Sequence, residues 1–178
     1  ILGVAFVTVF IMFAGYRGDR IQAFLHPETA GDKGYQTLMG LYAIGSGGLF
    51  GKGLGESLQK LGNVPESQND MIFTIICEEL GVFGAIMVLI LFGMLLYRLL
   101  FIAQNAPDLY GSLIVTGIFA HIALQVILNV MVVINCIPTT GITLPFISYG
   151  GSSLIVSLIM VGILLNLSLI HISEPTRH

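Results

Sequence analysis

The chain has 178 residues, of which 55% are hydrophobic and only 10% are charged. A soluble domain typically carries about 25% charged residues, so this composition excludes an ordinary soluble protein and indicates an integral membrane protein. The formal net charge of −3 is small and acidic. Because a nucleic-acid-binding protein presents a basic face, nucleic acid is excluded as a partner.

Four apolar segments are expected to form membrane-spanning helices. Residues 1–16 are apolar throughout and lack a basic n-region, so we interpret them as the end of a spanning helix and not as a signal peptide. Residues 80–97 are uncharged and, with the apolar flank from residue 71, exceed the roughly 20 residues that a bilayer requires. Pro107 and Asp108 signal the start of the next helix, and a Pro- and Gly-rich link precedes the last one. The predicted spans are 1–16, 71–102, 109–137 and 152–168.

The loop at 17–70, between the first two spans, is too long to be a simple connection and must carry structure or function. Residues 34–50 mix apolar residues with Gly and Ser, and they are too short and too polar to span a bilayer. An interfacial or re-entrant helix is expected there. The many glycines at 45–55 allow the backbone to approach another backbone, or a ligand, closely.

Basic residues crowd into the same loop, which holds Arg17, Arg20, Lys33, Lys52 and Lys60. By the positive-inside rule these charges would place the loop in the cytoplasm. That rule has little force for long loops, so the charge count carries little weight.

Four carboxylates lie where the polar loop enters the second span: Glu66, Asp70, Glu78 and Glu79. Acids at a lipid boundary are costly and usually have a role. Asp70 follows Glu66 by four residues, so both can share a helix face if helical geometry begins by Pro65. Neighbouring carboxylates raise one another's pKa, which suits a general base. The pattern equally fits two acids that merely satisfy a helix N-terminus.

Glu78 and Glu79 would lie deeper in the same helix. About 80° separates Glu78 from Asp70 around a helix with 3.6 residues per turn, whereas Glu79 points nearly the opposite way. Glu78 is therefore the better candidate to line a cavity with Asp70. A buried acid tied to a polar partner is an equally good interpretation of both glutamates.

Other polar side chains have both a functional and a structural interpretation. Lys52 and Lys60 can bind a diphosphate, with Lys60 the stronger candidate, although interfacial anchoring is the alternative. Ser152 lies in a turn that can cap the last span. His121, Gln125 and Asn129 recur every four residues on one face of the third span, where interhelical hydrogen bonds would explain them.

Several separated blocks, in the same order, resemble the signature of the SEDS family of bacterial shape, elongation, division and sporulation proteins. They are GKGLGESLQK at 51–60, Pro65-Glu66 with Asp70, EELG at 78–81 and LPFISYGGSS at 144–153. The resemblance covers roughly residues 1–168, and it is nearer to the FtsW and SpoVE branch than to RodA. Residues 169–178 depart from it and are expected to be a non-native tail.

The resemblance implies an all-α polytopic fold of about ten membrane spans, of which this chain would hold the last four. It implies a peptidoglycan glycosyltransferase of the bacterial cytoplasmic membrane that polymerises lipid II for division or sporulation. Its expected partners are lipid II, the undecaprenyl diphosphate-linked glycan, a class B penicillin-binding protein and other divisome membrane proteins. In such proteins the long loop faces outward, and these specific blocks outweigh the charge count.

The resemblance also implies roles for individual residues. Asp70 occupies the position of the catalytic aspartate and would deprotonate the acceptor hydroxyl, with Glu66 as its supporting acid. Tyr149 and Ser152 lie in an outer loop that flanks the cavity and would contact substrate. A divalent cation, Mg²⁺ or Mn²⁺, can assist at the diphosphate, and no organic cofactor is expected. The alternatives are a lipid II transporter and a divisome scaffold without chemistry.

Overall fold

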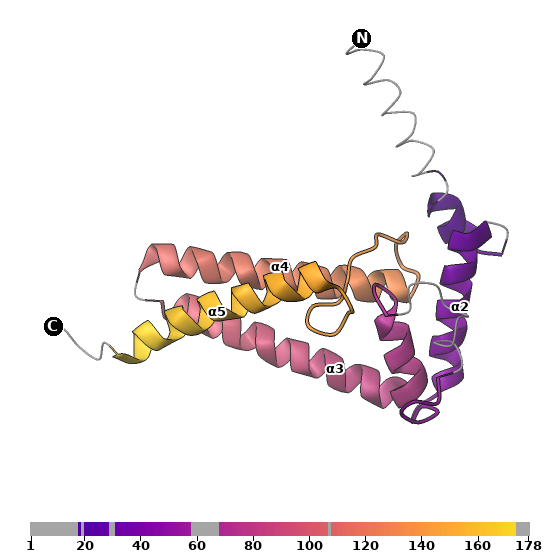
Figure 1. The fold of residues 1–178 in the computed structure, drawn as a ribbon, viewed down its shortest axis with the longest axis horizontal. Coiled ribbons are helices and arrows are strands. Elements are labelled where there is room, and N and C mark those ends of the chain that lie inside the picture. Colours follow the sequence, from indigo (N-terminus) through magenta and orange to yellow (C-terminus); the bar gives the residue numbers. More distant parts are fainter. Residues whose placement is uncertain (1–17, 19, 29–30, 58–67, 107, 174–178) are drawn as a thin grey trace, which may run out of the picture.

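The structure is a computed structural model that describes residues 18, 20–28, 31–57, 68–106 and 108–173. These residues form helices, turns and loops, and no strand occurs among them. The helices are α2 (Gly31–Gly47), α3 (Ile72–Gln104), α4 (Leu109–Val133) and α5 (Gly151–Ser173), and residues 20–25 are also helical (Figure 1). The predicted all-α class is confirmed, and α2 lies where a short helix was expected in the long loop. The span predicted at 1–16 lies outside the described residues.

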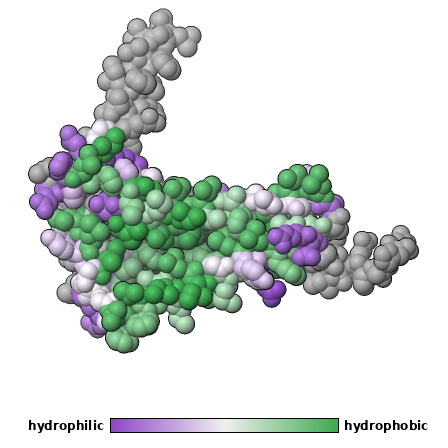
Figure 2. Space-filling model, turned by 180° about the vertical axis from the view of Figure 1, so that it is seen from behind, coloured by the Kyte–Doolittle hydropathy of each residue, from purple (hydrophilic) through white to green (hydrophobic). Residues whose placement is uncertain are grey.

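Helices α3 and α4 form an antiparallel hairpin with α5 beside it, while α2 stands across one end (Figure 1). Both α3 and α4 are long and apolar enough to cross a membrane. Only 17% of the most apolar window of α3 and 28% of that of α4 are buried. A hydrophobic surface covers the long body and hydrophilic residues gather toward its ends (Figure 2). This distribution is typical of helices that face lipid.

The hairpin is closed by a tight connection between α3 and α4. Asp108 is the N-cap of α4, and its carboxylate accepts a hydrogen bond of 3.2 Å from the backbone N–H of Gly111. The Ser112 hydroxyl donates back to the carbonyl of Ala103 at 2.8 Å. The sequence predicts a helix start at this point, and the side chain of Asp108 caps that helix.

The chain changes direction at Gly81, inside α3 (Figure 1). Gly81 has φ 68° and ψ −166°, a conformation that is essentially restricted to glycine. Residues 72–80 therefore form a first segment that packs beside α2, and the chain continues after the kink into the long apolar segment. The structure differs here from the prediction of one continuous helix over 71–102.

The loop after α2 supplies the backbone partners that α3 loses at this kink. In a straight helix, the amides at positions 82 and 83 would donate to the carbonyls at 78 and 79. Instead both pairs bond to the loop: Lys52 N to Glu78 O at 3.0 Å, Gly53 N to Glu79 O at 3.0 Å, Val82 N to Gly48 O at 3.0 Å and Phe83 N to Leu49 O at 3.2 Å. The loop and the kinked segment thus provide hydrogen-bond partners for each other's backbone groups. Buried backbone N–H and C=O groups need such partners.

This pairing needs glycine on both sides. A Cβ atom on Gly47 or Gly51 would overlap the backbone carbonyl of Cys77 or Glu79, and one on Gly81 would overlap the backbone of the loop. The prediction that the glycine-rich segment approaches another backbone closely is correct at these positions.

Gly81→Ala is therefore expected to destabilise the full-length protein by about 2–3 kcal/mol, because alanine is strained at this φ and its Cβ has no space. The measurement is the unfolding midpoint in detergent. Gly93→Ala is the matched control, since Gly93 lies in the same helix with no other group within 4 Å of its Cβ position. That substitution should be neutral or slightly stabilising. Equal effects of both changes would contradict the importance of the kink.

The link between α4 and α5 folds back beside α4. Helix α4 ends at Val133, earlier than the predicted 137, and Asn135 and Phe146 take positive φ values in the link. Leu144 and Ser148 close a turn with two hydrogen bonds, Leu144 N to Ser148 Oγ at 2.7 Å and Ser148 N to Leu144 O at 3.1 Å. As a result α5 begins beside the middle of α4 and not beside its end (Figure 1).

Candidate functional site

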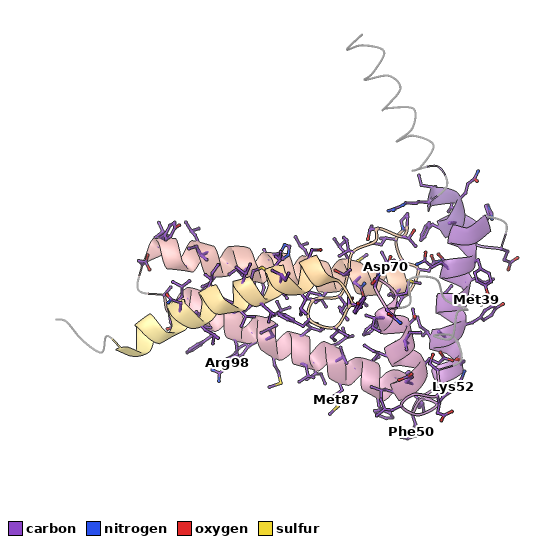
Figure 3. The ribbon with its side chains drawn as sticks, viewed as in Figure 1. Met39, Phe50, Lys52, Asp70, Met87 and Arg98 are labelled. Atoms are coloured by element: carbon purple, nitrogen blue, oxygen red, sulfur yellow. The ribbon has the colours of Figure 1, made fainter. Side chains whose placement is uncertain are left out.

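Asp70 lies in a turn at 68–71, directly before α3. The helix begins at Ile72 with Met71 as its N-cap, and no acidic residue occupies its first turn. The prediction that Asp70 and Glu78 lie on one common helix is therefore wrong, and the angle expected between them does not apply. Asp70 is half-buried, at the end of the bundle near α2 (Figure 3).

The turn that carries Asp70 is tied to two other segments. Asn129 of α4 is buried, and its Nδ2 donates to the carbonyl of Asp70 and to the carbonyl of Ile142, both at 2.8 Å. The backbone N–H of Tyr149 donates to the carbonyl of Gln68 at 2.8 Å. Three segments far apart in the sequence thus converge at Asp70, and the prediction of interhelical bonding for Asn129 missed that its partners are loop carbonyls.

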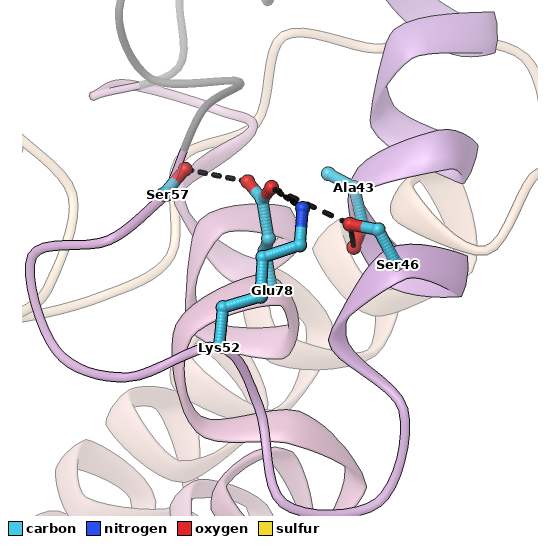
Figure 4. Close-up of polar contacts among 5 residues, drawn as sticks. All are labelled: Ala43, Ser46, Lys52, Ser57 and Glu78. Carbon is cyan, nitrogen blue, oxygen red and sulfur yellow. Dashed lines mark hydrogen bonds and ion pairs between the residues drawn. The ribbon is translucent and has the colours of Figure 1, made fainter.

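Glu78 forms a second polar cluster with the loop after α2 (Figure 4). Its Oε1 accepts from Lys52 Nζ at 2.6 Å and from Ser46 Oγ at 3.4 Å, and its Oε2 accepts from Ser57 Oγ at 2.5 Å. Glu78 is fully buried, whereas the Lys52 side chain is 29% exposed. Both carboxylate oxygens are engaged, so the contacts favour a buried acid tied to polar partners. These partners help to offset the cost of burying the carboxylate.

The structure does not bring this cluster to Asp70. Glu78 lies six residues, or about 9 Å, along α3 from its first residue, Ile72, and Lys52 lies toward the far end of that segment (Figure 3). Glu78 compensates the charge of Lys52, so Lys52 would have to break this ion pair to bind a diphosphate. Glu79 is half-buried, and its carbonyl accepts from the loop. Glu66 and Lys60 lie outside the described residues.

Ser152 lines a different feature, a cavity of about 240 Å³ between α4 and α5. One apolar side chain, Val156, and six polar ones surround it: His121, Gln125, Thr143, Ser152, Ser153 and Ser157. Sequence reasoning identified the stripe of His121 and Gln125 on α4 but did not predict this cavity. The stripe itself was the signal, since polar residues repeated along one face of an apolar helix mark a polar surface. Tyr149, three residues before Ser152, is 78% exposed.

The fold and these sites define a polytopic helical membrane protein with a polar turn at one end of its apolar bundle. The family described as "Cell cycle protein", which comprises FtsW, RodA and SpoVE, matches residues 1–171. The chain belongs to this family, and the predicted SEDS membership is confirmed.

Individual relatives agree with this assignment. The chain is 50% identical over 169 residues to stage V sporulation protein E of Bacillus subtilis, covering 94% of this chain and 46% of that protein. It is 44% identical to the probable peptidoglycan glycosyltransferase FtsW of Trichlorobacter lovleyi, covering 94% of this chain and 44% of that protein. The chain therefore spans slightly less than half the length of these relatives.

Solved structures show the same fold. A chain of a peptidoglycan synthase complex matches with a TM-score of 0.68 and 25% identity, over 97% of this chain and 49% of that chain. The rod shape determining protein RodA of Thermus thermophilus matches with a TM-score of 0.56 and 38% identity, over 78% of this chain and 42% of that chain.

Proposed function

We propose that this chain is the C-terminal part of a peptidoglycan glycosyltransferase that polymerises lipid II in cell division or sporulation. The observation that carries the proposal is the match over 94% of the chain to relatives named probable peptidoglycan glycosyltransferases, at 42–44% identity. The placement of Asp70 supports it, because the backbone of its turn is fixed at the end of the bundle by bonds to α4 and to the link before α5, which suits a general base.

In the proposed reaction, Asp70 takes the proton of the acceptor sugar hydroxyl. The hydroxyl oxygen then attacks the anomeric carbon at the lipid-linked end of the growing glycan. The bond from that carbon to the diphosphate oxygen breaks, its electron pair leaves with undecaprenyl diphosphate, and the anomeric configuration inverts. A base in reach of the reacting hydroxyl typically contributes 10²- to 10⁴-fold to such a rate.

The hydrogen bonds to the Asp70 turn give this base a fixed position. Asn129 holds the carbonyl of Asp70 from a helix, and elements of the scaffold position a reactive group more accurately than a free loop does. Glu66 remains the proposed supporting acid, and Lys60 the proposed diphosphate ligand. Lys52 is ion-paired with Glu78, so Lys60 is the better candidate to meet the negative charge on the leaving diphosphate.

A bound metal has less support from the residues. Within the ranges that the structure describes, no group of three His, Cys, Asp or Glu side chains could hold a metal ion. The predicted Mg²⁺ or Mn²⁺ would therefore need ligands from outside those ranges or from the substrate diphosphate. None of the proposed steps depends on it.

The membrane setting follows from the same proposal. The protein would lie in the bacterial cytoplasmic membrane, with the Asp70 end of the bundle facing outward, where lipid II is polymerised. A class B penicillin-binding protein and other divisome membrane proteins would be its partners. The structural match to a chain of a peptidoglycan synthase complex supports a partner of this kind.

The test uses the purified full-length protein with lipid II. Glycan strands longer than one disaccharide, resolved by gel electrophoresis, are the expected product. In a parallel assay, lipid II is placed in one leaflet of liposomes and its appearance in the other leaflet is measured. Transfer between leaflets without any polymer would support the lipid II transporter instead, and neither activity would support the scaffold.

A further inference from the structure

The cavity between α4 and α5 lies at an unusual depth for polar side chains. His121 is near the middle of α4, which is apolar enough along its length to cross a membrane. The cavity nevertheless has six polar side chains in its wall. Polar groups at this depth are expensive and usually face a substrate path or one another.

The hydrogen-bonding capacity of the wall is only partly used. Thr143 and Ser153 share a hydroxyl–hydroxyl bond of 3.0 Å, and Ser157 donates to the carbonyl of Ser153 at 2.8 Å. Gln125 Oε1 is buried and has no hydrogen-bond partner among the described residues. Buried side-chain oxygens are nearly always hydrogen-bonded, so this acceptor calls for a donor that the described residues do not supply.

The chemistry of the wall limits what that group can be. The lining residues offer hydroxyls, an amide and an imidazole, and none of them is Lys, Arg, Asp or Glu. A diphosphate would be matched by cationic side chains and a lipid tail by apolar ones. Uncharged hydroxyl and amide groups are matched by neutral donors and acceptors such as these. The cavity has a volume of about 240 Å³, which is enough for one small ring.

The cavity also lies next to the Asp70 turn. Asn129, which donates to the carbonyl of Asp70, is one helical turn beyond Gln125 on the same face of α4. Asn129 donates as well to Ile142, the residue before Thr143 in the cavity wall. Gln125 is therefore about one helical turn, roughly 5 Å, along α4 from Asn129, whose side chain holds the Asp70 turn.

We propose that the α4–α5 cavity binds one uncharged sugar ring of the lipid-linked substrate, with Gln125 Oε1 accepting a hydrogen bond from that ring. This inference rests on the proposed function. A ring held there would help to place the reacting hydroxyl or anomeric carbon at Asp70.

The test compares two ligands that differ only in the sugars. Affinities for lipid II and for undecaprenyl diphosphate are measured with the full-length protein carrying Asp70→Asn, so that binding is followed without turnover. Adding Gln125→Leu should weaken lipid II binding about tenfold and leave undecaprenyl diphosphate binding unchanged. Ser157→Ala should act in the same direction with a smaller effect. Thr116→Val is the matched control, because Thr116 is exposed on α4 outside the cavity and its hydroxyl bonds to Ser112.

Two outcomes would overturn the inference. Unchanged lipid II affinity in Gln125→Leu would show that the sugar does not reach the cavity. An equal loss for both ligands would show that the cavity holds the tail or the diphosphate, or that the substitution disturbs the fold. Polymerisation by the parental protein is measured in parallel, so failure of the proposed enzyme activity is recognised separately from failure of the sugar site.

Discussion

Replacing Asp70 with asparagine is expected to slow glycan polymerisation by the full-length protein about 10²- to 10⁴-fold. Asparagine keeps the shape of the side chain but cannot accept the proton of the acceptor hydroxyl. The turn itself should persist, because its bonds to Asn129 and Tyr149 use the carbonyls of Asp70 and Gln68 and not the Asp70 carboxylate. Affinity for lipid II should therefore change little, so the loss should appear in the turnover rate.

Asp108→Asn provides the matched control for this change. Asp108 is also a carboxylate at the start of a helix, but it lies at the opposite end of the α3–α4 hairpin. Asparagine caps helices as well as aspartate does, so this variant should keep both its stability and its polymerisation rate. Parental polymerisation by Asp70→Asn would show that Asp70 is not the base. An equal loss in both variants would indicate a general effect of removing a carboxylate.

The sequence predicts the helices well where apolar residues continue over many turns. Helices α4 and α5 begin at or next to the predicted residues 109 and 152, because a Pro-Asp pair and a Gly- and Ser-rich turn mark their first turns. The short helix of the long loop was also predictable, since residues 34–50 are apolar enough to pack but too short to span. In these segments the local signals and the final fold agree.

The kink in α3 could not be predicted in the same way. The residues around Gly81 continue the apolar run on both sides, and a single glycine inside a helix is usually tolerated. The break depends on hydrogen bonds to residues 48–53, about thirty positions earlier in the chain. Such a non-local pairing leaves no periodic pattern in the sequence. The sequence therefore predicts one straight span over 71–102, with residues 72–80 as its first part.

The polar residues of the candidate site stand out in the sequence, but their arrangement in space does not. Asp70, Lys52 and Glu78 were identified from charge in an apolar setting, and the structure describes all three. The expectation that Glu78 lines a cavity with Asp70 assumed one straight helix through both, whereas the structure ties Glu78 to Lys52 and the loop after α2. The role of Asn129 as a clamp on the Asp70 turn depends on the return of the 134–150 link, which only the tertiary fold reveals.

Breaking the Lys52–Glu78 pair is expected to destabilise the full-length protein by about 3–5 kcal/mol. In Lys52→Met the fully buried Glu78 carboxylate would lose its cationic partner, and the hydroxyl contacts of Ser57 and Ser46 do not neutralise its charge. The double variant Lys52→Met/Glu78→Leu should be more stable than Lys52→Met alone, because no charge is then left without compensation. Chemical denaturation in detergent, followed by helical circular dichroism, measures these differences.

The two interpretations of Lys52 make opposite predictions for these variants. If Lys52 serves the fold by holding the loop against the kink, the single variant loses stability and the double variant recovers part of it. Ser46→Ala, which removes the 3.4 Å contact to Glu78 and a hydrogen bond of 3.0 Å to the carbonyl of Ala43, should then cost about 1 kcal/mol. If Lys52 instead binds the substrate diphosphate, Lys52→Met would keep its stability and lose lipid II affinity. A stable Lys52→Met protein with weakened lipid II binding would therefore contradict the structural role and restore Lys52 as a phosphate ligand.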